Sequence, residues 1–375
     1  MSGTIATNPN RQSGTIGSVP SATKDSSNPS WTTNPASGVG TEWHNTTSGE
    51  VFICIDATTD LNKWIGMRDN DISPPGSRAV IGGGQTGGAA TQVNNIDYFN
   101  ITATANAQDF GDLTLARTPA SNGVSNGVSD RAVFGGGNYP PNNTLDYITI
   151  STPGNAADFG DQSVTRGSGL GAFSNGTNDR GVWGGGVNND DEIDYVTIST
   201  TGNAVDFGNL TQGRYGVSGL SNATDERGLF CGGWLSSTTN RIDYITISTP
   251  GNAADFGDIL TAGYSTGALS NATNDRGCIA GLNPNSSTYH NVIQYVTVTS
   301  TGNAQDFGDL SGLRTSLTGV SNGISERGVW CGGNDGSSKL NILEYITINS
   351  PGNTADLGDL TAGRASCGGA SDGAL

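Results

Sequence analysis

Apolar and polar residues alternate over short segments along most of the chain, and turns rich in Gly, Ser, Asn and Pro separate these segments. Residues 243–248, Asp-Tyr-Ile-Thr-Ile-Ser, show the alternation that is typical of a strand with one buried face. The longest apolar run, residues 51–55, is far too short to span a membrane. The pattern therefore predicts an all-β fold with many tight turns.

The same segments recur six times from Arg78 onward, about every 50 residues. Each repeat has an Arg-led apolar segment that ends in glycine, then a Tyr segment, then Asp-Phe-Gly or Asp-Leu-Gly. These elements stand at Arg78, Arg131, Arg180, Arg227, Arg276 and Arg327; at Tyr98, Tyr147, Tyr195, Tyr244, Tyr295 and Tyr345; and at Asp109, Asp158, Asp206, Asp255, Asp306 and Asp356. With the Gly/Ser stretch that precedes every Arg except Arg78, each repeat predicts four strands, the size of one propeller blade.

The two ends of the repeat region are out of phase. Arg78 has no Gly/Ser strand before it, whereas residues 366–375 supply one more such strand at the C-terminus. Pairing of this strand with the first repeat would close the array and remove its exposed edges. We therefore predict a six-bladed β-propeller over residues 78–375, closed by the C-terminal strand.

Glycine and cysteine have distinct expected roles in this fold. The chain holds 58 Gly, and the recurring Gly triplets would let neighbouring blades approach closely while the aromatic residues before them fill the space between blades. Five Cys without a Cys-x-x-Cys spacing predict neither a disulfide framework nor a zinc site. We expect all five to be small buried residues.

The N-terminal quarter differs from the repeats. Residues 1–40 are polar and read as an extended arm that could not fold alone. Residues 41–77 read as a small β-hairpin module and linker, with a Thr-Ser-Gly turn between Trp43 and Trp64. This module is interpreted either as an attachment module or as a cap on the propeller.

Charge and residue content exclude several functions. The formal net charge of −17 comes with only three Lys, and such a surface repels nucleic acid. We expect no membrane insertion, because the apolar runs are short. We expect no cofactor and no metal, because the chain has only His44 and His290 and no EF-hand pattern. Asp-Phe-Gly recurs in the repeats, so we interpret it as structural and expect its Asp to pair with the recurring Arg or with turn amides. No catalytic residue is singled out, although a glycosidase carboxylate pair stays open.

Candidate binding residues lie where the repeats differ. The connections between the second and third strands vary from repeat to repeat and would share one face. They carry Tyr139, Asp190, Asp191, Glu192, Trp234, Tyr289, His290 and Lys339. This mixture suits stacking on sugars or packing on protein. The alternative is sequence drift in loops that touch only water.

The repeats resemble the kelch-type β-propeller. Their sequence is similar to repeats in virion proteins of marine and cyanobacterial tailed phages, and the residues that carry this similarity are Ser-Asn-Gly-x-x-Asp-Arg-Gly-Val-Phe-Gly-Gly-Gly with Asp-Tyr-Ile-Thr-Ile-Ser-Thr-Pro-Gly-Asn-Ala. The resemblance implies a non-enzymatic structural protein of the virion, assembled in the host cytoplasm. Residues 1–77 would bind other virion proteins, and the propeller would bind a host surface glycan or receptor. A capsid or tail decoration protein and a polysaccharide-degrading enzyme are the alternatives.

Overall fold

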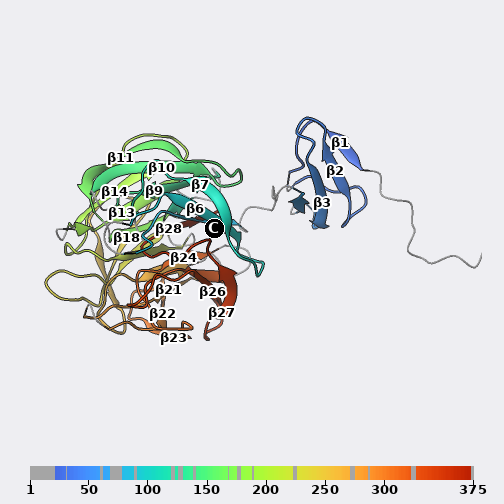
Figure 1. The fold of residues 1–375 in the computed structure, drawn as a ribbon. Helices are drawn as coiled ribbons and strands as arrows, with labels where there is room; N and C mark the ends of the chain where they lie inside the picture. Colours follow the sequence, from blue (N-terminus) through green and yellow to red (C-terminus); the bar gives the residue numbers. More distant parts are fainter. Residues whose placement is uncertain are drawn as a thin grey trace, which may run out of the picture. The chain divides into compact units, whose positions relative to one another are not determined.

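The computed structural model describes residues 22–30, 32–59, 62–67, 78–87, 91–119, 123–125, 130–137, 141–167, 169–174, 179–187, 190–222, 226–270, 275–285, 288–321 and 327–372. The chain divides into two compact units, Met1–Pro74 and Pro75–Leu375 (Figure 1). The described residues contain no α-helix and form seven four-stranded sheets, one in unit 1 and six in unit 2. The predicted all-β class is therefore confirmed.

Unit 1 holds one sheet in the order β1-β2-β3-β4. Its strands are β1 (Thr23–Asp25), β2 (Glu42–Asn45), β3 (Val51–Asp56) and β4 (Lys63–Gly66). Strand β1 lies within the segment expected to be an extended arm, yet it pairs in parallel with β2. Phe52, Cys54 and Trp64 form the buried cluster on one face of the sheet.

Unit 2 consists of six antiparallel sheets, each made of four strands. The first holds β28 (Gly368–Ser371), β5 (Arg78–Gly82), β6 (Asn95–Asn100) and β7 (Gln108–Asp112); the second β8 (Val124–Ser125), β9 (Arg131–Gly135), β10 (Asn142–Thr149) and β11 (Ala157–Arg166); the third β12 (Gly171–Ser174), β13 (Arg180–Gly184), β14 (Glu192–Thr197) and β15 (Val205–Asn209). The fourth holds β16 (Ser218–Ser221), β17 (Arg227–Cys231), β18 (Arg241–Thr246) and β19 (Ala254–Asp258); the fifth β20 (Gly267–Ser270), β21 (Arg276–Ala280), β22 (Val292–Thr297) and β23 (Gln305–Asp309); the sixth β24 (Thr318–Ser321), β25 (Arg327–Cys331), β26 (Ile342–Thr347) and β27 (Ala355–Asp359).

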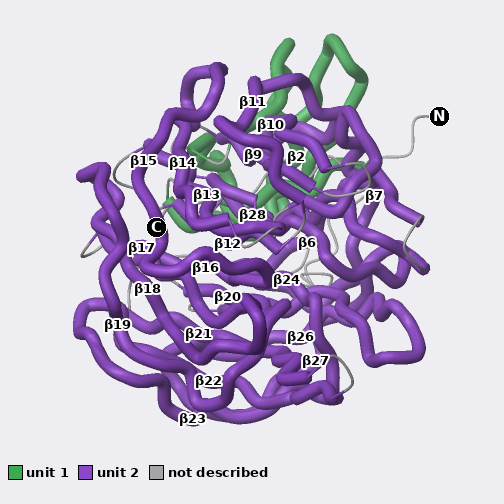
Figure 2. The backbone as a smooth tube through the Cα atoms, turned by 90° about the vertical axis from the view of Figure 1, so that its left-hand side faces the viewer, with its two compact units in different colours: residues 1–74 green, residues 75–375 purple. Residues whose placement is uncertain are grey.

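The C-terminal strand completes the sheet that the first repeat begins. Strand β28 pairs with β5, with Gly368 opposite Gly82, so this predicted pairing is confirmed. The first strands of consecutive sheets contact one another in the order β8, β12, β16, β20, β24 and β28, and β28 contacts β8. Figure 2 shows these strands toward the middle of unit 2 and the fourth strands toward its edge. The fold is therefore propeller-like.

Large and small residues face each other between neighbouring sheets. A Cβ on Gly135 would lie 2.7 Å from the Trp183 Nε1 of the next sheet, and one on Gly184 would lie 2.6 Å from the Phe230 ring. Trp183 and Phe230 are fully buried. Such close packing requires a residue without a side chain opposite each aromatic ring. The expected packing role of glycine thus applies to the first glycine of these triplets.

The five cysteines are buried and carry free thiols, as predicted. A second feature of the core was not predicted. In each sheet of unit 2 a β-bulge separates an apolar residue from the polar residue that follows it, for example Ile242 from Asp243. Because a bulge breaks the in-and-out alternation of side chains, both residues become buried.

Candidate binding face

Each sheet of unit 2 has two ends, which differ in how much the repeats vary. The repeated end holds the connections between first and second and between third and fourth strands, such as residues 150–156. The variable end holds the connections between second and third strands, such as residues 232–240, and those that lead to the next sheet. The repeated end carries nearly the same residues in every sheet, whereas the variable end does not.

The recurring arginines of the repeated end stack on tyrosine rings. The Arg180 guanidinium carbon lies 4.6 Å from the centre of the Tyr195 ring, and Arg180 donates a 2.7 Å hydrogen bond to the Ile247 carbonyl of the next sheet. Arg78, Arg131, Arg227, Arg276 and Arg327 make the equivalent contacts. Of the two expected partners of the recurring Asp, these arginines are wrong for the described residues, because a ring and a carbonyl take the guanidinium instead. The other, a turn amide, is found at Asp206, which accepts a 3.2 Å hydrogen bond from the Gly208 N–H.

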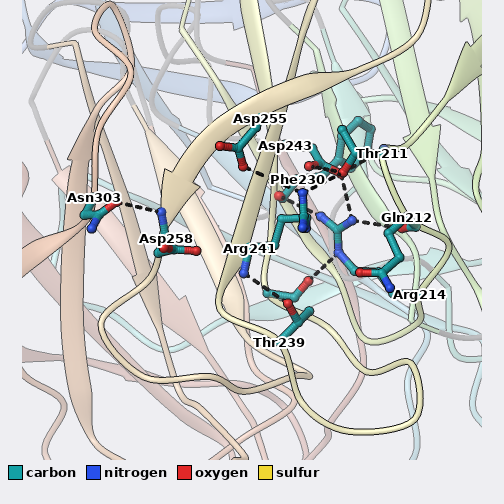
Figure 3. Close-up of polar contacts among 11 residues, drawn as sticks. Thr211, Gln212, Arg214, Phe230, Thr239, Arg241, Asp243, Asp255, Asp258 and Asn303 are labelled. Atoms are coloured by element: carbon teal, nitrogen blue, oxygen red, sulfur yellow. Dashed lines mark hydrogen bonds and ion pairs between the residues drawn. The ribbon is translucent and has the colours of Figure 1, made fainter.

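The Asp-Phe-Gly segments hold neighbouring sheets together. Gly257 has a φ of +148°, and a Cβ there would lie 2.4 Å from the Gly302 carbonyl oxygen. The Asp258 N–H donates a 3.1 Å hydrogen bond to Asn303 Oδ1 in the same turn (Figure 3). Equivalent bonds to Asn106, Asn155, Asn203, Asn252 and Asn353 join the other neighbouring sheets. These polar groups of the repeated end are engaged in contacts between sheets.

Buried ion pairs lie beneath the variable end. Arg214 follows β15, and its NH1 lies 2.7 Å from Asp243 Oδ2 in β18 of the next sheet, with both side chains fully buried. Asp243 also accepts a 2.6 Å hydrogen bond from the Thr211 hydroxyl (Figure 3). The corresponding pairs are Arg117–Asp146, Arg166–Asp194, Arg314–Glu344 and Arg364–Asp97. A buried charge is destabilising unless an opposite charge compensates it, so we interpret these pairs as part of the packing between sheets.

The pKa shifts within these pairs follow from burial. Desolvation lowers the pKa of Arg117 and Arg314, and the charge of the paired acid opposes the shift. Desolvation likewise raises the pKa of Asp194, opposed by Arg166. These pairs were not predicted, although an arginine recurs in the sequence a few residues after five of the six Asp-Phe-Gly or Asp-Leu-Gly segments.

The sheet β20–β23 replaces the ion pair with uncharged residues. Gly263 stands at the position of the arginine, and Gln294 stands at the position of the acid. Leu282 replaces a glycine that contacts the arginine elsewhere, as Gly233 contacts Arg214. A Cβ on Gly263 would lie 2.7 Å from Leu282 Cδ2, so the leucine fills the space left by the arginine. The amide of Gln294 needs no opposite charge.

The acidic run predicted as a binding element is partly structural. Asp190 Oδ2 lies 3.3 Å from the Nε of buried Arg166. Asp190 also accepts a 3.1 Å hydrogen bond from the Glu192 N–H, and Glu192 Oε1 accepts one of 2.7 Å from the Ser163 hydroxyl. Asp191 is exposed. Asp190 and Glu192 therefore help to fold the connection that carries them.

Tyr289 and His290 are half-buried in the connection between β21 and β22. A Cβ on Gly336 would lie 2.7 Å from Tyr289 Cε2, so Tyr289 packs against the connection of the next sheet. In that connection Lys339 is half-buried, and desolvation lowers its pKa against the effect of Asp335. Tyr139 lies outside the described residues.

The structure brings Trp234 together with two further aromatic residues. The Trp234 and Tyr264 ring centres lie 5.5 Å apart, and the Tyr215 and Tyr264 ring centres lie 5.8 Å apart, both edge to face. The three side chains are half-buried. Tyr215 and Tyr264 were not predicted, because they lie in connections that lead to the next sheet and not in second-to-third connections. Comparison of the repeats would have revealed them, since the equivalent position holds Thr315 and Ala365 elsewhere.

A hollow of about 100 Å³ opens beside this aromatic cluster. Its lining includes one residue from before the first strand of each of the six sheets, which places it at the middle of the variable end: Pro119, Gly169, Gly216, Ser265, Ser316 and Ser366. Tyr215 also lines it. We call it the central hollow. Its lining carries hydroxyl groups, backbone groups and an aromatic ring, which can bind a polar uncharged molecule.

The described part of the chain was also compared with the requirements of a metal site and of a membrane-spanning helix. No group of three or more His, Cys, Asp or Glu side chains is placed there to hold a metal ion. The described residues also contain no helix long and apolar enough to cross a membrane. Comparison of the whole chain with protein-family models and with curated proteins finds no match.

Proposed function

We propose that the chain is a non-enzymatic virion structural protein of a tailed phage, in which unit 2 is a six-bladed kelch-like propeller that binds a host surface glycan or receptor. The six four-stranded sheets and the pairing of β28 with β5 support the propeller. The similarity of the repeat sequence to virion proteins of tailed phages supports the virion role. The variable end is the proposed binding surface.

The observation that carries the binding role is the contrast between the two ends of unit 2. At the repeated end, the recurring arginines and Asn side chains bind neighbouring sheets, as Arg180 and Asn303 do. At the variable end, Trp234, Tyr264 and Tyr215 form a partly exposed aromatic cluster beside a hollow. Aromatic side chains with a polar group nearby are frequent anchors in binding sites.

Unit 1 is proposed to attach the chain to other virion proteins. Ile53 and Ile65 face each other across β3 and β4, and with Ile55 and Met67 they make an apolar row. These four side chains are 38%, 43%, 48% and 73% exposed, in the order Ile53, Ile65, Ile55 and Met67. An exposed apolar row on a small sheet is typical of a surface that binds another protein.

Two measurements test this proposal. Antibodies against unit 2, applied to purified particles of a phage that encodes the chain, should label the particle surface. A fragment of residues 75–375 should fold and still bind host cells but should not join particles. An unlabelled particle surface would refute the virion role.

A separate measurement with the full chain tests for enzymatic activity. The full chain is incubated with polysaccharide from the host envelope, and the reducing ends are counted over time. We expect no increase above that of a heat-denatured sample. A steady increase would replace the binding role with depolymerisation.

A further inference from the structure

Three serines around the central hollow have an unusual backbone conformation. Ser265, Ser316 and Ser366 have φ angles of +56°, +56° and +55°. At the equivalent position of two other sheets stand Gly169 and Gly216, which also have positive φ. Glycine adopts this conformation without strain, whereas serine does not. Side chains kept at a strained position often have a functional role.

The hydroxyl groups of these serines have hydrogen-bonding capacity to spare. In the part of the chain that the structure describes, none of the three forms a hydrogen bond through its hydroxyl, and all three side chains are half-buried. Their backbone is fixed, because Ser265 N–H donates to the Gly216 carbonyl and Ser316 N–H to the Ser265 carbonyl, each at 2.8 Å. The fold thus fixes the backbone that carries these three hydroxyl groups beside the hollow.

An aromatic wall faces the same hollow. Tyr215 lines it directly. The Tyr264 ring packs on Gly216, where a Cβ would lie 3.0 Å from Tyr264 Cδ2. Trp234 extends the cluster from the connection between β17 and β18. Hydroxyl groups and aromatic rings together suit a sugar, which has C–H groups that pack on a ring and hydroxyl groups that form hydrogen bonds.

The charge of the lining and the size of the central hollow restrict the class of ligand further. The described lining of the hollow contains no charged side chain, and the nearby Arg214 is already paired with Asp243. The net charge of −17 disfavours an acidic ligand. A hollow of about 100 Å³ is smaller than most ligand pockets, which suits a single terminal residue better than an enclosed chain.

We propose that the central hollow binds one uncharged pyranose residue at the end of a glycan, with Tyr215 as the stacking surface and Ser265, Ser316 and Ser366 as the hydrogen-bonding groups. This inference rests on the proposed glycan-binding function and specifies its ligand class. It also moves the site from the second-to-third connections to the middle of the variable end.

Binding of the full chain to immobilised oligosaccharides tests the inference. One set ends in glucose, galactose, mannose or N-acetylglucosamine, and a matched set ends in sialic or uronic acid. The triple variant Ser265→Gly, Ser316→Gly, Ser366→Gly removes the hydroxyls while glycine keeps the positive φ. We expect an unchanged or raised melting temperature and at least a tenfold loss of affinity for an uncharged terminal sugar. Tyr215→Ala should lose as much, whereas Leu313→Ala, an exposed position in a connection at the same end, should bind normally.

Three outcomes would overturn the inference. They are binding only to the acidic set, binding that the serine and Tyr215 variants leave unchanged, and failure to bind any saccharide. Attachment to host cells distinguishes the last outcome from failure of the proposed function. If wild-type chain attaches to cells without binding any saccharide, the receptor is a protein and only this inference fails. If it does not attach to cells either, the proposed receptor role fails as well.

Discussion

The Ser125 hydroxyl donates a hydrogen bond to the Ser371 carbonyl, although the two residues lie 246 positions apart in the sequence. Ser371 in turn donates to Ser321 at 2.6 Å. Ser174, Ser221 and Ser270 continue the series, each donating to the serine of the sheet before it, and Ser321 donates to Ser270. The six serines close a ring of hydrogen bonds at the ends of the first strands, and that ring requires β28.

Deletion of residues 366–375 should therefore destabilise unit 2. It removes the partner of β5 and two bonds of the serine ring. We expect a melting temperature lower by at least about 5 °C, measured by calorimetry. Deletion of residues 373–375 alone leaves β28 intact and is the control. Equal melting of the full chain and the longer deletion would refute the role of β28 in closure.

The glycine of Asp-Phe-Gly should be sensitive to substitution, unlike the glycine of the turn that packs on it. Gly257→Ala combines a φ of +148° with a Cβ 2.4 Å from the Gly302 carbonyl oxygen, so we expect a loss of about 2 kcal/mol or more in the free energy of unfolding. A Cβ on Gly302 meets no atom within 4 Å. Gly302→Ala should therefore be neutral or stabilise slightly. Denaturant unfolding of both variants measures the difference, and equal effects would contradict the proposed contact.

Two buried thiols should make stability fall at alkaline pH. Burial raises the pKa of Cys231 and Cys278 to about 12, above the ordinary value of 9.0. Between pH 9 and 12 the unfolded chain loses these protons while the folded chain keeps them, so the free energy of unfolding decreases as pH rises, by on the order of 1 kcal/mol per pH unit for each thiol. Below pH 9 this contribution stays constant. Cys231→Ala should flatten the alkaline slope of a chemical denaturation series, and an unchanged slope would refute the assignment.

The repeats made much of the fold predictable. They show which residues recur, and the phase mismatch at their ends indicates that the C-terminal strand pairs with the first repeat. The contacts between sheets were harder to predict from the sequence. The Arg180 contact with Ile247 joins two repeats, and a single repeat does not show which residues of the next one it meets.

The candidate site was predictable only in part. Trp234 was identified because its connection varies, but its cluster with Tyr215 and Tyr264 depends on how consecutive sheets pack. The buried acids were missed for a different reason. Strand alternation places the residue after a buried Ile242 on the outer side, whereas the bulge at Asp243 turns it inward.

The sheet β20–β23 suggests how the buried ion pairs can be tested. It is folded with Gln294 and Leu282 where other sheets hold an acid and a glycine, so the fold tolerates the absence of the whole pair. Removal of one partner is different, because it leaves a buried charge without compensation. Arg214→Met alone should lower the free energy of unfolding by about 3–5 kcal/mol. The losses of Arg214→Met and Asp243→Asn, added together, should exceed the loss of the double variant.

The double variant Arg214→Met, Asp243→Asn should recover part of this loss. It leaves no unpaired charge, and the asparagine oxygen can still accept the bond that the Thr211 hydroxyl donates to Asp243 at 2.6 Å. Urea unfolding of the four proteins in this double-mutant cycle gives the coupling energy directly. Strict additivity would show that the 2.7 Å contact between Arg214 and Asp243 does not couple the two sheets. A double variant more stable than Arg214→Met alone would instead show that the buried pair and the uncharged arrangement around Gln294 are interchangeable solutions at the same place in the fold.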